Sequence, residues 1–208
     1  MHRVTQVWLV SFAVTALLAS PGAGAADCKY QTDSTDKFTK IRTLRTNWDS
    51  LMSWTTGFGS EDYSDTYVSA LSKGKGESIN RYLSVKISAY KYSKYRPRDY
   101  ELENLIVVQE DARLLVMMEE QTIVELQASR GETARSSYQA PGSDGGEYSI
   151  TTVIAIGYTL DESTANLLMA QNATHIRVET AEGNHNVEIH KKSLGDIKKA
   201  VKCILDPP

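Results

Sequence analysis

The clearest alternation of apolar and polar positions lies late in the chain, between Tyr148 and Cys203. Its first segment, up to Tyr158, is rich in Ile, Val and Thr, which is typical of a strand. A helical segment, two short alternating strands around Glu182 and Gly183, and a second helix follow. This order predicts a β-α-β-β-α unit.

The two short strands predict a hairpin with the Glu-Gly pair at its turn, since Gly readily takes a positive φ. In this register Val178 pairs with Val187, and His175 pairs with His190. Side chains alternate between the two faces of a strand. The face that we expect in the core carries Ile176, Val178, Val187 and Ile189. The face that we expect in solvent carries His175, Arg177, Glu179, Asn186, Glu188 and His190.

Helix signals flank this hairpin. Thr159 and Glu162 have the spacing of a capping box, and Ser193 with Asp196 gives a weaker version of it. The last helix has an apolar stripe of Leu194, Ile197, Val201 and Ile204. Its other positions include Lys198, Lys199 and Lys202, which we interpret as a solvated face.

Earlier segments are read from the same patterns. Residues 83–89 alternate as a half-buried strand does. Further strands are expected at 39–46, 102–108 and within 113–127. The stretch 57–76 is interpreted mainly as a loop with a turn of helix at 67–71, and 130–147 as a flexible loop. The whole predicts an α+β fold of antiparallel hairpins and the C-terminal unit, in a single domain closed by a terminal disulfide.

The N-terminus carries the features of an export signal. His2 and Arg3 precede an apolar run at residues 7–18, and a small-residue cleavage site follows at 23–25. The run is shorter than the about 20 residues that a membrane span needs. We therefore expect a signal peptide over 1–25, a domain over 26–208, and no transmembrane segment. Cys28 lacks a lipoprotein signature before it, so the expected location is periplasmic or secreted.

The chain has two cysteines, Cys28 and Cys203, near the two ends of the expected mature domain. An even number of cysteines in an exported chain favours pairing. A bridge between them would stabilise the fold by about 5 kcal/mol on the chain-entropy model.

The net charge of the chain limits the classes of molecule that it is expected to bind. Lys and Arg number 23 against 26 Asp and Glu, for a net charge of −3, and loss of Arg3 with the leader makes the domain more acidic. This balance argues against general attraction to nucleic acid. An unidentified protein partner is the leading expectation.

Basic and aromatic residues interleave where the strand at 83–89 ends. They are Lys91, Tyr92, Lys94, Tyr95, Arg96, Arg98 and Tyr100. Such a segment can hold a phosphate- or sugar-bearing polymer through charge and ring stacking. The same residues with Pro97 also suit a strand edge protected from aggregation. Two interpretations are also open for the aromatic residues Trp48, Trp54 and Phe58. They can form a platform on which a carbohydrate stacks, or they can pack in the core or at its rim.

Motifs of catalysis are not found. The sequence contains no Gly-x-Ser-x-Gly, no His-Glu-x-x-His and no phosphate-binding glycine loop. His175 and His190, paired across the predicted hairpin, are weak candidates for a metal site, because a third ligand such as His185 falls on the other face. No cofactor is expected, and an enzymatic role is not favoured.

The chain resembles small exported bacterial proteins of unknown function. The resemblance rests on Cys28 near the mature start, a strand onset at 38–39, the strand at 83–89 and the final strand-helix-hairpin-helix-Cys order. It implies no activity. Two functions remain: a non-catalytic binding or envelope-associated protein, or a binder of a small ligand or glycan polymer through the Tyr/Lys-rich strand end, with weak metal binding as a variant.

Overall fold

A computed structural model describes residues 28–53, 63–98, 106–143 and 145–207. The expected signal peptide, Trp54, Phe58 and Tyr100 lie outside these residues. Within them the chain forms a single domain made mostly of antiparallel sheet, with two helices. This confirms the α+β class in its coarse form.

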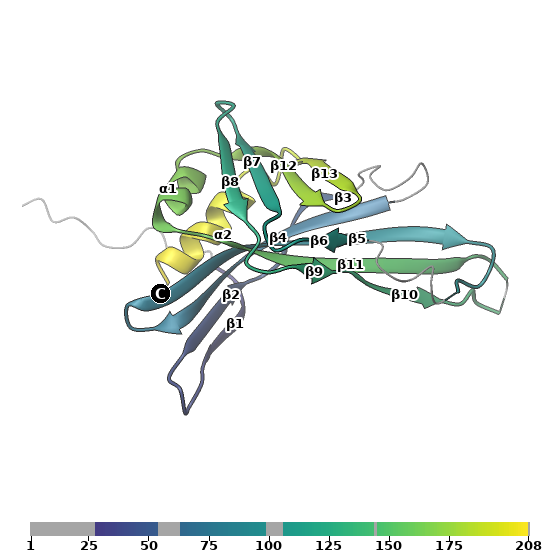
Figure 1. Cartoon of the computed structure of the whole chain (residues 1–208), viewed down its shortest axis with the longest axis horizontal. Coiled ribbons are helices and arrows are strands. Elements are labelled where there is room, and N and C mark those ends of the chain that lie inside the picture. Colours follow the sequence, from purple (N-terminus) through teal and green to yellow (C-terminus); the bar gives the residue numbers. More distant parts are fainter. Residues whose placement is uncertain (1–27, 54–62, 99–105, 144, 208) are drawn as a thin grey trace, which may run out of the picture.

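The larger sheet has seven strands in the order β1-β2-β4-β5-β11-β10, and β3 also pairs with β4. The strands are β1 (Tyr30–Thr35), β2 (Arg42–Thr46), β3 (Asp49–Ser53), β4 (Tyr63–Lys75), β5 (Ser78–Ser93), β10 (Arg135–Gln139) and β11 (Tyr148–Thr159). Figure 1 shows that β4, β5 and β11 run along the length of the molecule, while the β1–β2 hairpin projects from it.

The second sheet has four strands in the order β13-β12-β7-β8, and β6 pairs with β9 in a small ribbon. Their bounds are β6 (Val107–Val108), β7 (Arg113–Met118), β8 (Ile123–Gln127), β9 (Glu132–Thr133), β12 (Ala173–Thr180) and β13 (Gly183–Glu188). The order expected for the C-terminal stretch is present, but its first strand belongs to the larger sheet and its hairpin to the smaller one.

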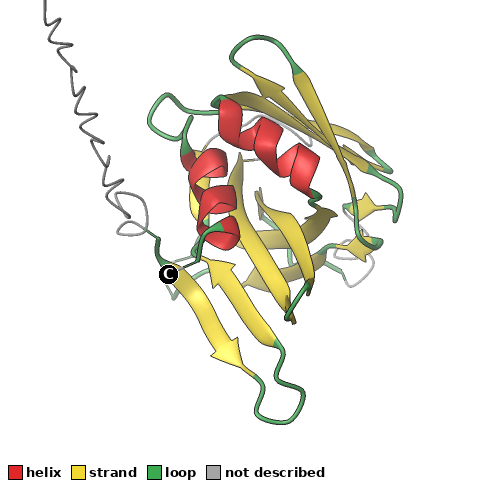
Figure 2. Cartoon of the chain, turned by 90° about the vertical axis from the view of Figure 1, so that its left-hand side faces the viewer, coloured by secondary structure: helices red, strands yellow, loops and turns green. Residues whose placement is uncertain are grey.

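One hydrophobic core lies between the two sheets, and the helices close one end of it (Figure 2). Helix α2 (Asp196–Leu205) packs on β4 and β2, and α1 (Glu162–Ala170) packs on α2 and β8. The stripe of α2 is buried at Ile197, Val201 and Ile204 as its spacing indicates, and Ala200 is buried beside it. The lysines of α2 lie on its other side, away from these buried positions.

Helix α1 is capped by a different residue from the one expected. Asp161 is the N-cap, and its carboxylate accepts a hydrogen bond from the backbone N–H of Thr164 at 2.7 Å. Thr159 is the last residue of β11. The prediction of Thr159 as the cap was wrong, because the strand pairing of β11 extends to that residue.

The β12–β13 hairpin is paired two positions away from the predicted register. Val178 lies opposite His185, not opposite Val187, and the two turn residues precede Gly183, whose φ is 131°. A shift of two positions leaves every side chain on its predicted face. The aliphatic face is therefore buried as predicted, while the predicted cross-strand pairs are wrong.

Two stretches expected to be loops contain strands. Most of 57–76 that the structure describes belongs to β4, and β9 and β10 occupy part of 130–147. Strand β3 lies in a segment for which no strand was expected. In β4 the apolar alternation is weak, because two of its inward positions are the buried polar residues Ser64 and Thr66.

The predicted disulfide is confirmed. Cys28 and Cys203 are bonded, with their Cα atoms 5.6 Å apart and a sequence separation of 175. The bond joins the start of β1 to helix α2. Next to it the Tyr30 hydroxyl donates to the backbone carbonyl of Cys203 at 3.0 Å.

Candidate functional site

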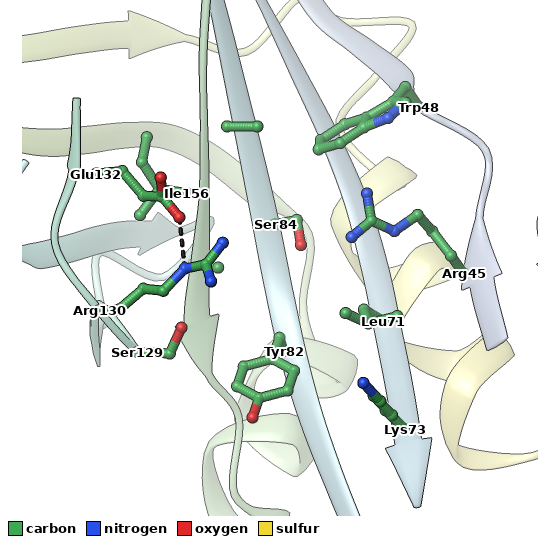
Figure 3. A pocket seen from close by; sticks show the side chains of 12 residues that line it. Arg45, Trp48, Leu71, Lys73, Tyr82, Ser84, Ser129, Arg130, Glu132 and Ile156 are labelled. Atoms are coloured by element: carbon green, nitrogen blue, oxygen red, sulfur yellow. Dashed lines mark hydrogen bonds and ion pairs between the residues drawn. The ribbon is translucent and has the colours of Figure 1, made fainter. Parts of the chain in front are cut away.

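One hollow among the described residues is a groove on the outer face of the larger sheet, with a volume of about 450 Å³. Figure 3 shows side chains that line it. The lining residues are Arg45, Trp48, Leu71, Lys73, Tyr82, Ser84, Ser129, Arg130, Glu132, Ala155, Ile156 and Gly157. They come from β2 and the connection to β3, from β4, β5 and β11, and from β9 and the segment that leads to it.

Strand register brings these residues together. Arg45 lies opposite Leu71, which lies opposite Tyr82, so three neighbouring strands contribute to one row. In the next row Ser84 lies opposite Gly157. The small side chains at these positions keep the floor low, and the longer side chains rise around it.

On one side of the groove, aromatic rings and positively charged side chains are stacked in a series of cation–π contacts. The Nζ atom of Lys86 lies 4.2 Å from the ring centroid of Tyr67 and 5.2 Å from that of Trp48. The guanidinium carbon of Arg45 lies 5.7 Å from the Trp48 centroid. Cation–π contacts of this kind hold the Trp48 ring and the Arg45 head group in place at the groove.

The opposite wall carries an ion pair. Arg130 Nε donates to Glu132 Oε1 at 2.5 Å. In Figure 3 Arg45 and Arg130 point toward the floor strand from opposite sides, and Lys73 lies beside Leu71. With Glu132 matched by Arg130, the lining keeps the charges of Arg45 and Lys73. The groove is thus locally positive on a chain whose net charge is negative.

The predicted binding segment lies elsewhere. Its described residues Lys91, Tyr92, Lys94, Tyr95, Arg96 and Arg98 are all exposed, at and after the end of β5. Tyr92 is eight positions from Ser84 along β5, which corresponds to about 27 Å. Arg96 Nε donates to the Tyr138 hydroxyl at 2.9 Å, and its guanidinium lies over the Tyr138 ring. This end therefore has basic and aromatic groups, but none of them lines the groove.

The predicted histidine pair is not formed. His175 lies opposite Glu188, and His190 follows the end of β13, where its backbone N–H donates to the Leu51 carbonyl at 3.0 Å. The shift in register separates the two rings. Over the described part of the chain, no group of three or more His, Cys, Asp or Glu side chains is arranged to hold a metal ion.

His185, the third histidine considered as a metal ligand, is part of the core. His185 is buried between the sheets, and its Nε2 lies 3.0 Å from the hydroxyl of Thr66 on β4. Burial lowers the pKa of His185 to about 4. Its ring is therefore neutral at physiological pH and forms a polar contact across the core.

No helix within the described ranges has both the length and the apolar character needed to cross a membrane. Comparison of the chain with protein-family models, with curated proteins and with solved structures found no match. The groove was not predicted from the sequence, because its residues come from five separate segments. Two local signals were present in the sequence: Trp48, considered there for a carbohydrate platform, and the outward series of the strand at 83–89, which carries Ser84 and Lys86.

Proposed function

We propose that the protein is an exported, non-catalytic binding protein whose groove holds an acidic sugar polymer. The observation that supports this most is the groove itself, where Trp48 and Tyr82 lie beside Arg45 and Lys73. Aromatic rings offer flat apolar faces to sugar rings, and guanidinium and ammonium groups bind carboxylate or sulfate. The groove is open, which suits a segment of a longer chain.

The lining residues supply binding chemistry from several directions. Arg45 can form two parallel hydrogen bonds to a carboxylate, while Lys73 acts as a point charge. Ser84 and Ser129 add hydroxyl groups at and beside the floor. Such convergent polar groups around a partly apolar hollow are characteristic of ligand sites. Export and envelope location belong to this proposal through the expected signal peptide and the disulfide.

Isothermal titration calorimetry with polygalacturonate, heparin and neutral dextran tests the proposal. We expect the purified protein to bind the acidic polymers and not dextran. Arg45→Gln and Lys73→Gln should each weaken binding by about tenfold. Ala155→Leu, at an exposed position of the lining, should block the groove without entering the core.

The double variant Lys91→Gln, Lys94→Gln is the matched control, because it removes from the strand end as much charge as Arg45→Gln and Lys73→Gln together remove from the groove. It should bind as the wild type does. If it lost affinity while the groove variants kept theirs, the site would lie at the strand end. Equal affinity of the wild type for dextran would contradict an acidic ligand.

A further inference from the structure

A second feature of the molecule, independent of the groove, is the turn of the β1–β2 hairpin. Phe38 at this turn is 95% exposed, the most exposed large hydrophobic side chain among the described residues. Lys37 and Lys40 are also exposed. Arg42 lies opposite Gly74, close to the end of β4, so residues 36–41 extend past that strand. Figures 1 and 2 show the hairpin standing out from the body.

The turn that presents Phe38 is held by its own hydrogen bonds. One carboxylate oxygen of Asp36 accepts from the backbone N–H of Phe38 at 3.0 Å, and from the N–H and hydroxyl of Thr39 at 2.6 and 2.8 Å. These bonds, those to Thr39 first, lower the pKa of Asp36. Lys40 takes a φ of 61°, which turns the chain back. These bonds fix the backbone of the turn, so that the position from which the Phe38 ring projects is set.

Most backbone donors of the turn have acceptors within it. Besides the bonds to the Asp36 carboxylate, Lys40 N–H donates to the Asp36 carbonyl at 3.0 Å and Asp36 N–H donates to the Ile41 carbonyl at 2.9 Å. Ile41 N–H lies 3.4 Å from the Thr39 hydroxyl. Backbone groups paired in this way lose little when water is removed, which is the requirement for entering lipid.

The base of the hairpin is fixed as well. Arg42 forms two hydrogen bonds with the Asp33 carboxylate, both at 2.9 Å, across the β1–β2 pair. The disulfide from Cys28 to Cys203 holds the start of β1 against α2. The hairpin is therefore attached at both ends to the body, and Phe38 moves with it.

Charge and size identify the partner. Around the tip, Lys37 and Lys40 outnumber Asp36, while Lys75 and Glu77 at the adjoining β4–β5 turn balance each other. The turn comprises residues 36–41 only, whereas each side of a standard protein interface contributes about 20–30 residues. An aromatic ring with lysines beside it matches the boundary between head groups and acyl chains of an anionic bilayer.

We propose that the β1–β2 hairpin contacts an anionic lipid surface and places the Phe38 ring in its interface. The lysines bind to the lipid phosphates, and the largely paired backbone of the turn lowers the cost of placing the ring in the interface. The body and its groove stay in water above the surface. This contact requires no spanning segment.

Co-sedimentation with vesicles tests the proposal. We expect the wild type to bind vesicles of phosphatidylcholine mixed with phosphatidylglycerol, and to bind pure phosphatidylcholine far less. Phe38→Ser should reduce partition by about tenfold. Lys37→Gln with Lys40→Asn should reduce it by about fivefold for each lysine, Asn being chosen because it tolerates the positive φ. All variants keep the same N-terminus, so that the apolar run at 7–18 contributes equally to each.

Tyr95→Ser is the matched control, since Tyr95 is 82% exposed but lies after the far end of β5. It should bind as the wild type does, and all variants should keep the wild-type melting temperature. In Phe38→Trp, brominated lipids should quench an added fluorescence component. Three results would overturn the proposal. Phe38→Ser could bind vesicles as well as the wild type does, or the wild type could fail to bind them. The third result is that no vesicle binding occurs while Phe38→Ser loses a protein that co-purifies with the wild type.

Discussion

His185 makes the stability of this protein depend on pH in a way that can be calculated. Its folded pKa of about 4 lies below the ordinary value of 6.5, because the charged ring would lose its hydration in the core. The unfolded chain thus binds a proton at a higher pH than the folded chain does. The stabilising effect of the neutral ring is complete above pH 6.5 and is lost as the pH falls through the range from 6.5 to about 4.

The size of the loss follows from the shift of the pKa. Each unit corresponds to about 1.4 kcal/mol. Between pH 7.5 and pH 5 the free energy of unfolding should fall by about 2 kcal/mol through this residue, and by about 3 kcal/mol at pH 4. Carboxylates that are ion-paired in the fold, such as Glu179 with Arg113, add their own loss at low pH.

The variant His185→Gln separates these contributions. Gln does not titrate between these pH values, and its side-chain amide can still reach the Thr66 hydroxyl. Urea unfolding followed by circular dichroism, at several pH values from 7.5 to 4, gives both curves. We expect the variant to lose about 3 kcal/mol less than the wild type over this range. Parallel curves would refute the reasoning and show that the folded ring takes up its proton as readily as the unfolded one.

Three other results are expected from the structure. The double variant Cys28→Ser, Cys203→Ser should lower the free energy of unfolding, measured in denaturant, by about 5 kcal/mol. A loss below about 1 kcal/mol would show that closing this long loop does not stabilise the fold as the chain-entropy model predicts. Val178→Asp should cost several kcal/mol, because it buries a carboxylate in the core, whereas the exposed Glu188→Gln should change stability by less than about 0.5 kcal/mol; equal effects would contradict the faces of the hairpin. Asp161→Ala should lower stability by about 1 kcal/mol through loss of the cap of α1. In the same melting assay Thr159→Ala should lower stability less. A larger loss in Thr159→Ala than in Asp161→Ala would support Thr159 as the cap, as the sequence predicted.

The hairpin shows which part of a fold apolar patterning determines. The alternation of Ile176, Val178 and Val187 identifies the buried face correctly, because burial follows a period of two. A shift of the pairing by two positions keeps that pattern, so the pattern does not select between the two registers. Gly183 does not select between them either, because a single Gly is compatible both with a place in the turn and with the place just after it that it takes here.

Strand β4 shows the opposite case, a core strand with only a weak apolar signal, because polar residues share its buried positions with Val68 and Ala70. Ser64, Thr66 and Ser69 are buried there, and a hydroxyl in a core needs a partner that only the tertiary structure provides. Ser69 donates to the Thr46 carbonyl at 2.9 Å, and Thr66 meets His185 from a strand 119 residues away. The groove on the other face of this sheet was missed for the same reason, since its residues become neighbours only through strand pairing.

The bond between Cys28 and Cys203 can form only late in the synthesis and folding of the chain. Its two sulfur atoms are 175 residues apart, so one waits as a free thiol until almost all of the described fold has been synthesised. Any chain that stops before α2, or fails to dock it on the larger sheet, keeps a reactive cysteine beside β1. Such a thiol can form mixed disulfides with oxidoreductases. The closed bond therefore distinguishes a finished molecule from an unfinished one.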